Sequence, residues 1–370
     1  MPTLTVHFPF LENLSHPPRL LISRVGGQKI NTGMDYTVAM QRAIALAEKG
    51  LGKTAPNPIV GAVIIDAAGA IIAEGFHDRM NSADHAEVVA IKAAGNKTNG
   101  STIVVTLEPC NHKGSTGPCA QAIIDAGITT VVYAVSDPNV KAAGGAETLR
   151  AAGITVVEGV LRDEAAYSNR AWLTKITKNR PYFTWKVATT LDAKVAATDG
   201  TSKWITNEVS RADVQVLRRQ ADAILVGTNT VIADDPHLIP RGDFAGYAHN
   251  PVRVICGEQT LPTNAQVFDN AADTVVVASK DLDVLVENLN ELGVNQVFVE
   301  AGPTLGSAML DHCLLDELII YQAPSLLGSG KQFFVFDYPS TISNQMRLDH
   351  ISTQVLNGDV KSVYGIRNGE

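Results

Sequence analysis

Three short segments, His85-Ala86-Glu87, Glu108-Pro109-Cys110 and Gly117-Pro118-Cys119, constrain the fold, because a shared metal ion requires the chain to bring them to one point. One imidazole and two thiolates give Zn²⁺ three protein ligands and leave its fourth tetrahedral position for water. Zinc held in this way lowers the pKa of that water to about 7. The segments therefore predict one catalytic zinc ion per chain, with ligands His85, Cys110 and Cys119.

The spacing of these residues predicts where they sit. Positions two apart in a helix point to nearly opposite sides, so His85 and Glu87 share a site only if His85 enters a helix and the first turn overhangs the pocket. Cys110 follows a buried strand, and Cys119 begins another helix. Strand ends and helix N-termini are where open α/β sheets place ligands, and a helix N-terminus favours a thiolate.

The order His-x-Glu, Pro-Cys, Cys is typical of zinc nucleobase deaminases, whose glutamate is unligated and acts as general acid and base. Glu87 would carry the proton here. Eight residues separate Cys110 from Cys119 instead of two. A structural zinc remains an alternative, since isolated histidines and buried cysteines are commonly packing residues. It would need a fourth ligand, for which His112 is the nearest candidate.

The first half of the chain alternates strands and helices, which predicts a three-layer α/β domain. The predicted helices are Val38–Ala47, His85–Ala94, Ala120–Ala126, Ala146–Ala152 and Asp163–Lys178, and the predicted strands are Ile59–Ile65, Ile71–Ala73, Ser101–Leu107, Thr130–Ala134 and Thr155–Glu158. Residues 1–33 are expected to form an irregular extension, with Met34 as an alternative start. The N-terminal domain would span residues 34–178.

Asn179-Arg180-Pro181 reads as a linker, after which the pattern restarts in a second α/β domain at residues 181–370. Its predicted strands are Tyr182–Thr189, Ala223–Gly227, Pro251–Cys256, Thr274–Ala278, Gln296–Glu300 and Glu317–Ala323, and its predicted helices are Asn207–Arg219, Leu282–Leu292 and Leu305–His312. The two halves share no internal repeat, so we expect them to perform different tasks.

Charge and composition argue against several classes of partner. The chain of 370 residues has a net charge of −8 and a pI near 5.6, which argues against nucleic acid as a partner. No apolar run approaches the roughly 20 residues of a membrane span. Four cysteines do not suggest a disulfide framework, and no signal peptide is evident, so a cytoplasmic location is expected.

Beyond the metal ligands, the first half resembles the deaminase domain of the bifunctional deaminase/reductases of riboflavin biosynthesis. The resemblance rests on the stretched cysteine spacing and on the segments Asn57-Pro58-x-Val60-Gly61, Pro109 to Gly114, Asp137-Pro138-Asn139 and Gly144-Gly145. It implies a cytidine-deaminase-like α/β/α fold and a diaminopyrimidinone substrate carrying a ribosylamino 5-phosphate, whose 2-amino group is replaced by oxygen.

By this resemblance Asn57 would hold the pyrimidine, and His77 and His112 would lie near the phosphate. Ordinary loop polarity is the alternative for Asn57 and His77, and for Lys113 as well. Ser115 stands where the family has Arg or Lys, so a phosphate contact is in doubt and Lys113 becomes the substitute.

The second half resembles the reductase domain of the same family, which implies a dihydrofolate-reductase-like α/β fold. The segments that carry the resemblance are Leu191-Asp192-x-Lys194, Ser202 to Thr206, Thr230 to Pro236 and Glu300 to Leu305. The family uses NADPH to open and reduce the ribose to a ribityl chain, by hydride delivery to C1′. A homo-oligomer formed through the reductase domain is expected as well.

The residues themselves give weaker support for a dinucleotide site. Gly302 to Leu305 joins a strand to a helix, whose N-terminal N–H groups could cradle phosphates, although a Gly-Pro turn is more often just a turn. No G-x-G-x-x-G occurs, which argues against a Rossmann domain. By resemblance the NADPH contacts fall on Ala188, Trp204, Thr230, Asp234, Gly302, Pro303, Thr304, Leu305, Gly306, Ser307 and Ala308.

The substrate contacts of the reductase fall, by the same resemblance, on Ser202, Arg218, Leu238, Arg241 and Glu300, with Lys186 a further candidate near the ribose. A guanidinium grips a phosphate through paired donors, which suits Arg218 and Arg241. The alternatives are that Trp204 is a core residue, Asp234 a turn or cap residue, and Arg218 a charge on a helix face.

Two departures concern cofactor affinity: Ala193 stands where a glycine is usual, and Cys256-Gly257 replaces Asp-Ser or Asp-Thr. Two other functions stay open at this point. One is a deaminase of nucleic-acid bases, which the acidic charge disfavours. The other is a non-catalytic scaffold that binds zinc and nucleotide.

Overall fold

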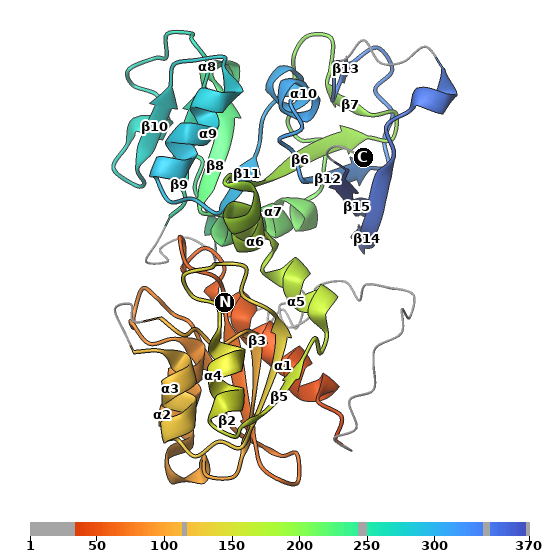
Figure 1. Ribbon diagram of the computed structural model, residues 1–370. Coiled ribbons are helices and arrows are strands. Elements are labelled where there is room, and N and C mark those ends of the chain that lie inside the picture. The colour runs from red at the N-terminus through yellow and green to blue at the C-terminus, as the bar shows by residue number, and fades with distance from the viewer. Residues whose placement is uncertain (1–33, 113–116, 243–249, 336–340, 368–370) are drawn as a thin grey trace, which may run out of the picture.

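The computed structural model describes residues 34–112, 117–242, 250–335 and 341–367. Figure 1 shows two lobes along the long axis of the molecule, each built on its own large sheet. The N-terminal sheet has the order β2-β1-β3-β4-β5. Strand β1 pairs antiparallel with β2 and β3, whereas β3, β4 and β5 are parallel. The bounds are β1 Gly61–Ile65, β2 Ile71–Phe76, β3 Thr102–Leu107, β4 Thr130–Val135 and β5 Thr155–Glu158.

Two glycines let helices approach opposite faces of this sheet. A β-carbon on Gly61 would lie 2.0 Å from the Ala43 carbonyl oxygen in α1 (Thr37–Ala47), and one on Gly75 would lie 2.3 Å from the Ala86 carbonyl oxygen in α2 (Ala86–Ala94). Figure 1 shows α2 together with α3 (Cys119–Asp125) and α4 (Gly145–Ala151) on one side of the sheet. The result is the predicted three-layer arrangement.

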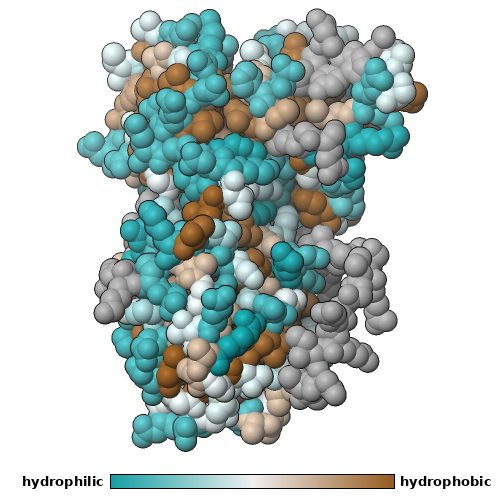
Figure 2. Space-filling model, in the orientation of Figure 1, coloured by the Kyte–Doolittle hydropathy of each residue, from teal (hydrophilic) through white to brown (hydrophobic). Residues whose placement is uncertain are grey.

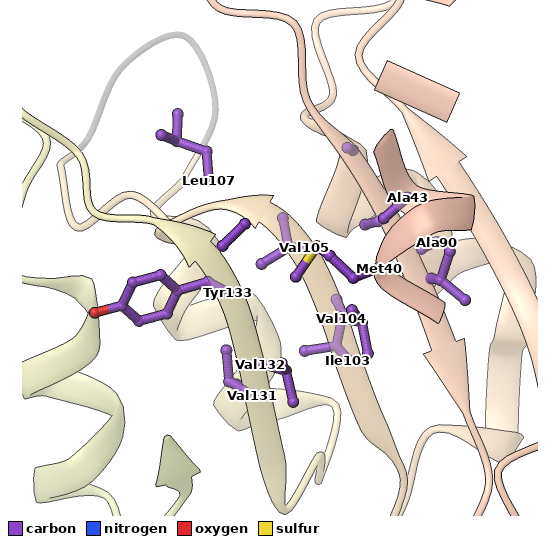
Figure 3. Packing of buried hydrophobic residues seen from close by; sticks show 14 of the residues in the cluster. Met40, Ala43, Ala90, Ile103, Val104, Val105, Leu107, Val131, Val132 and Tyr133 are labelled. Carbon is purple, nitrogen blue, oxygen red and sulfur yellow. The ribbon is translucent and has the colours of Figure 1, made fainter. Parts of the chain in front are cut away.

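The core of this half is aliphatic. Met40 of α1, Val104 and Val105 of β3, and Val131 and Val132 of β4 belong to this core, and Figure 3 shows them close together. All five side chains are fully buried. Burying a side chain of this size stabilises the fold by roughly 1.5–3 kcal/mol, so this packing fixes β3, the strand that leads to Cys110.

The helix predicted at Asp163–Lys178 is two helices, α5 (Arg162–Ser168) and α6 (Arg170–Lys178). The break falls at Asn169, whose side-chain Oδ1 accepts a hydrogen bond from the Ile59 backbone N–H at 3.3 Å. An asparagine side chain that bonds to the backbone competes with helical geometry. The break therefore ties the connecting helices to the segment that precedes β1.

The C-terminal sheet has the order β10-β9-β8-β11-β6-β12-β15-β14. Its strands from β10 to β12 run parallel to one another, and β15 pairs antiparallel with both β12 and β14. The bounds are β6 Tyr182–Thr190, β8 Ala223–Gly227, β9 Val252–Cys256, β10 Thr274–Val277, β11 Gln296–Val299, β12 Glu317–Ala323, β14 Leu348–Leu356 and β15 Asp359–Ile366. A small pair, β7 Lys194–Ala196 and β13 Lys331–Gln332, stands apart.

Helices cover both faces of this sheet. Leu285 and Leu289 of α9 (Leu282–Glu291) and Met309 of α10 (Pro303–Asp311) belong to one hydrophobic cluster. Val214 of α7 (Glu208–Gln220) and Val231 of α8 (Thr228–Asp234) belong to another. The parallel strands are therefore buried on both sides, as their continuous apolar runs indicate.

Most predicted elements are present with ends shifted by at most three residues, but α8, β7, β13, β14 and β15 were not predicted. Asn357 and Gly358, both at positive φ, form the turn between β14 and β15. Asn-Gly is a strong hairpin signal, so this hairpin was detectable from the sequence. The predictions for residues 1–33, Lys113 and Ser115 lie outside the described residues.

Figure 2 shows hydrophilic residues interspersed with separate hydrophobic patches over one face of the molecule. Among the described residues, no helix combines the length and the apolar character that crossing a bilayer requires. All four cysteines are free thiols.

Candidate metal centre and reductase site

The three predicted zinc ligands meet at the ends of three elements. His85 is the N-cap of α2, Cys110 follows β3, and Cys119 is the first residue of α3. The Nδ1 atom of His85 lies 3.6 Å from Cys110 Sγ and 3.2 Å from Cys119 Sγ. Tetrahedral zinc with its usual Zn–N and Zn–S bonds separates these atoms by roughly 3.5 Å. The ligand set therefore fits a zinc ion bound through Nδ1.

The Cys110 thiol has a lower pKa than an ordinary cysteine. The hydrogen bond from Cys119 is the main reason that the pKa of Cys110 falls to about 4, against the opposing effect of burial. The Cys119 backbone N–H also donates to Cys110 Sγ at 3.5 Å. Cys110 is therefore prepared as a thiolate, the form that binds metal. The hydrogen bond with Cys110 in turn raises the pKa of His85.

Glu87 lies in the first turn of α2 and is buried. Burial is the main cause that raises the pKa of its carboxyl group, and His85 opposes this effect. A raised pKa brings a carboxyl group closer to the pH at which an enzyme works, which favours general acid–base catalysis. The side chain therefore has the properties of a proton carrier beside the metal ligands.

Two of the metal ligands, His85 and Cys110, line a cleft of about 370 Å³. The three residues expected to bind substrate in this half, Asn57, His77 and His112, line the same cleft. Two residues of α6, Trp172 and Ile176, contribute to its wall. The complete lining is Pro56, Asn57, Pro58, Val60, His77, Arg79, His85, Glu87, Leu107, Glu108, Cys110, His112, Asp137, Asn139, Ala142, Trp172 and Ile176.

His77, one of the residues expected near the phosphate, has several contacts inside the cleft. It is buried beside the metal ligand His85, with ring centroids 5.3 Å apart. Its Nε2 lies 3.3 Å from Asn57 Nδ2, and its Nδ1 lies 3.0 Å from the Asp84 carbonyl oxygen. Burial lowers the pKa of His77, which favours a neutral ring. The geometry places His77 with Asn57, whereas His112 is exposed.

Sequence reasoning missed the roles of Glu108, Asp137 and Asn139, which line the same cleft. Glu108 accepts hydrogen bonds from the backbone N–H groups of Asp137 (3.2 Å) and Ala146 (3.0 Å). Burial raises the pKa of Asp137 to about 6. A β-carbon on Gly145 would lie 1.8 Å from the Pro109 carbonyl oxygen. The Asp-Pro-Asn and Gly-Gly segments were the signal that could have found this loop.

In the C-terminal half, Lys186 of β6, Arg218 of α7 and Glu300 at the end of β11 come together. Arg218 donates to both carboxylate oxygens of Glu300, at 2.5 and 2.9 Å, and to the Ile239 carbonyl oxygen at 3.2 Å. Three of the five N–H groups of its guanidinium are thus engaged inside the protein. Burial lowers the pKa of Lys186, and Glu300 opposes this effect.

The segment after α8 brings two further predicted substrate residues to this place. Leu238 is buried with φ +49°, and the Arg241 backbone N–H donates to Gln215 Oε1 at 3.0 Å. Arg241 is exposed, and its charge acts on both Arg218 and Glu300. Ser202 lies half-buried in the loop before α7.

The predicted cofactor residues lie around the N-terminus of α10. Gly302 is its N-cap, with no side-chain cap, and a β-carbon there would meet nothing within 4 Å. Backbone N–H groups at an open helix N-terminus fit a phosphate. Pro303, Thr304, Leu305 and Ala308 follow with at least partial exposure, as do Ala188 of β6 and Thr230 of α8.

Three predicted cofactor residues have contacts within the protein, and a fourth, Trp204, is exposed. A β-carbon on Gly306 would lie 2.2 Å from the Trp185 ring, so this glycine serves close packing. Ser307 Oγ accepts from the Val335 N–H at 2.8 Å. Trp204 is 67% exposed and therefore not a core residue. Asp234 pairs with Lys203 at 3.7 Å.

At both positions where the chain departs from the family pattern, the backbone has a positive φ. Gly257 has φ +133°, and a β-carbon there would lie 2.8 Å from Thr228 Oγ1, so Ser or Thr does not fit this backbone. Ala193 has φ +61°, a conformation that explains the usual glycine.

Comparison with known proteins matches both halves. The profile described as the cytidine and deoxycytidylate deaminase zinc-binding region covers residues 34–135, and the RibD C-terminal domain covers residues 181–361. The riboflavin biosynthesis protein RibD of Mycobacterium tuberculosis is 42% identical over 325 residues, 87% of this chain and 95% of the relative. The Escherichia coli protein is 39% identical over 324 residues, 78% and 88% of the two chains.

Two solved structures also match most of the chain. The Acinetobacter baumannii RibD structure has a TM-score of 0.82 and 37% identity, covering 90% of this chain and 98% of the other. A Thermotoga maritima enzyme described as a diaminohydroxyphosphoribosylaminopyrimidine deaminase/5-amino-6-(5-phosphoribosylamino)uracil reductase has a TM-score of 0.81 and 36% identity, covering 90% and 99%.

The fold and the sites define a bifunctional enzyme, a zinc-dependent deaminase joined to an NADPH-dependent reductase. The chain belongs to the RibD family of riboflavin biosynthesis deaminase/reductases.

Proposed function

We propose that this chain performs two consecutive steps on one phosphorylated pyrimidine. The first is hydrolytic deamination of a diaminopyrimidinone bearing a ribosylamino 5-phosphate, and the second is reduction of the ribosyl group to a ribityl group. The arrangement of His85 Nδ1, Cys110 and Cys119 beside the buried Glu87 is the main support. The Thermotoga maritima enzyme described above carries both activities in its name.

In the deaminase domain, His85, Cys110 and Cys119 hold zinc, which when bound supplies a water activated at neutral pH. Glu87 takes a proton from that water and passes it to the departing amino group, so that ammonia leaves as the oxygen bonds to the pyrimidine carbon. Asn57 holds the pyrimidine, with the neutral His77 beside it. His112, exposed at the cleft, is placed to meet the phosphate.

In the reductase domain, NADPH when bound supplies a hydride to the ribose C1′. The Gly302 to Ala308 segment, with Ala188, Trp204, Thr230 and Asp234, holds the cofactor. Lys186 and Glu300 lie where the ribose would bind, while Arg218 acts on substrate through Glu300 rather than directly. The substrate site of the reductase is completed by Leu238, Ser202 and Arg241. The exposed guanidinium of Arg241 is better placed than that of Arg218 to bind the phosphate.

We further propose residues 34–178 as the deaminase domain and 181–370 as the reductase domain. A homo-oligomer through the reductase domain is supported by the edge strand β14, whose only strand partner among the described residues is β15. Val355 on this strand is 68% exposed, and an exposed strand edge is prone to pairing. Free thiols at all four cysteines support a reducing, cytoplasmic location.

The test supplies the diaminopyrimidinone phosphate to the purified, zinc-loaded protein. Ammonia release without NADPH, followed by NADPH oxidation when the cofactor is added, supports the sequence of steps. Absence of ammonia release with one zinc per chain would indicate a scaffold instead. Deamination of single-stranded RNA or DNA in preference to the free pyrimidine would indicate a nucleic-acid deaminase.

A further inference from the structure

The segment that carries Asn57 is packed against the reductase domain. A β-carbon on Gly52 would lie 2.3 Å from the Arg219 carbonyl oxygen, at the end of α7. On Gly293, the residue two before Asn295, a β-carbon would lie 3.7 Å from Pro56. The cavity between the domains at this point is only about 20 Å³, enough for about one water molecule. The turn before Asn57 thus rests directly on the other domain.

One hydrogen bond joins the two domains at the substrate residue itself. Asn295 Nδ2 donates to the Asn57 carbonyl oxygen at 3.3 Å. The same Asn57 directs its side chain to the cleft, where Nδ2 lies 3.3 Å from His77 Nε2. The Asn57 backbone N–H donates back to Thr54 at 2.8 Å, which closes the turn. Within the described residues, Asn57 is therefore fixed from the deaminase side and from the reductase side.

Asn295 is a rigid donor. Its own N–H donates to Asp222 Oδ2 at 3.0 Å, and its carbonyl oxygen accepts from the Tyr182 N–H at 2.8 Å. The side chain is 5% exposed, and its Oδ1 is buried without a hydrogen-bond partner. A buried amide is normally hydrogen-bonded, and for Asn295 Nδ2 the partner is the Asn57 carbonyl oxygen.

We propose that Asn295 of the reductase domain is a positioning residue for deamination. By holding the Asn57 carbonyl oxygen, it fixes the turn that aims the Asn57 amide into the zinc cleft. This inference rests on the proposed role of Asn57 in binding the pyrimidine. It also gives a physical reason for the fusion of the two domains: the substrate-binding wall of the deaminase is completed from outside that domain.

Strand β11, which follows Asn295, runs from the interface with the deaminase domain to the reductase site. Asn295 immediately precedes β11, and Glu300 follows the same strand at its other end. One central strand therefore carries a residue that contacts the deaminase turn and a residue of the reductase site. Its neighbours β8 and β6 hold it in register along its length.

The experiment compares Asn295→Leu, which fills the space without a donor, and the milder Asn295→Ser, whose hydroxyl is too short to reach. Loss of one hydrogen bond predicts a rise in the deaminase KM of roughly 2- to 12-fold, with a smaller change in kcat. The reductase KM, measured with separately supplied deaminated substrate, and the zinc content should stay unchanged. These two readouts report folding of each domain.

Asn290→Ala is the matched control. Asn290 lies in the same interface and contacts Lys175 Nζ at 2.5 Å and the Asn179 carbonyl oxygen at 2.9 Å, but not the turn at Asn57. Its deaminase KM should match that of the unmodified enzyme. A parallel fall of both activities in the Asn295 variants, or an equal effect of Asn290→Ala, would overturn the inference in favour of general loosening.

Asn57→Ala separates this inference from the proposed function. This variant keeps the carbonyl group and loses the amide, so it should raise the deaminase KM, and adding Asn295→Leu should raise it little further. No effect of Asn57→Ala refutes the proposed role of Asn57. An effect of Asn57→Ala without any effect of the Asn295 variants leaves that role intact and refutes the action of Asn295. A full multiplicative effect in the double variant also refutes it.

Discussion

Arg218 and Glu300 form a two-pronged ion pair inside the reductase domain, with N···O distances of 2.5 and 2.9 Å. Their side chains are 8% and 13% exposed. Burial by itself would raise the pKa of Glu300, but the positive charges of Arg218, Lys186 and Arg241 hold it at about 2. Glu300 is therefore an obligatory anion among three cations, at the place where the ribose is proposed to bind.

Glu300→Gln should lower the free energy of unfolding at pH 7 by about 3 kcal/mol, the value of a shift from 4.5 to about 2. A depressed carboxyl pKa stabilises the fold above the unfolded pKa and ceases to do so as pH falls through the folded pKa. The difference between variant and unmodified protein should therefore shrink from pH 4.5 towards pH 2. Urea unfolding at several pH values measures it.

Glu258→Gln serves as the control, because Glu258 pairs with Lys280 on the surface at 2.8 Å. Exposed pairs contribute about 1 kcal/mol or less, so this variant should be nearly neutral. A stability difference for Glu300→Gln that stays constant down to pH 2 would contradict the assigned charge state. Reductase turnover should fall while ammonia release continues.

Glu87→Gln should reduce deamination by at least about 100-fold, since general acid–base groups contribute roughly that much or more. Zinc content should remain at one per chain, because Glu87 is not among the clustered ligand atoms. Ammonia release and metal analysis provide the two measurements, and Glu147→Gln, at an exposed position in the first turn of α4, is the control. Loss of zinc or of NADPH oxidation would show that Glu87 has another task.

The metal site was predictable because its signals are local. His85 before an apolar helix, Cys110 after a β-branched strand and Cys119 after Pro118 each mark an element end, and element ends were recognisable within a few residues. Three-layer packing followed from the alternation of strands and helices. Local patterns of this kind report which side of an element is buried.

Partners across the chain were not predictable from such patterns. Arg218 and Glu300 are 82 residues apart, and Asn57 and Asn295 are 238 apart. Periodicity identifies a buried face but not what it meets, so neither of these partner pairs was expected. The roles given to Arg218 and His77 near a phosphate come from the family resemblance and stay predictions. The break at Asn169 has the same cause, since its partner Ile59 is 110 residues away.

Arg170→Met should destabilise the junction between the domains. Arg170 lies 3.4 Å from Glu317, whose side chain is 1% exposed, and its guanidinium stacks over the Tyr167 ring at 4.3 Å. Removing one member of a buried ion pair costs about 3–5 kcal/mol. Thermal unfolding should show a lower midpoint, or two separate transitions for the two domains.

The double variant Arg170→Met with Glu317→Gln tests the cause of this loss. If the cost arises from the buried, uncompensated charge of Glu317, the double variant should regain part of the stability lost in Arg170→Met. An additional loss equal to that of a separate site would show that packing, rather than charge, dominates at this junction.

Ala193→Gly should make the protein more stable, by about 0.5–1 kcal/mol. Ala193 has φ +61° in the turn between β6 and β7, with its N–H donating to the Thr190 carbonyl oxygen at 3.0 Å. The left-handed conformation costs a residue with a β-carbon roughly 1–2 kcal/mol, whereas the greater freedom of glycine in the unfolded chain returns only about 0.4–1 kcal/mol. Urea unfolding of the variant beside Ala197→Gly, a nearby alanine without positive φ, measures the difference. Equal destabilisation of both variants would show that the turn is not strained. If Ala193→Gly is more stable and its NADPH affinity is unchanged, the glycine that the family usually has here serves the folding of this turn and not cofactor binding.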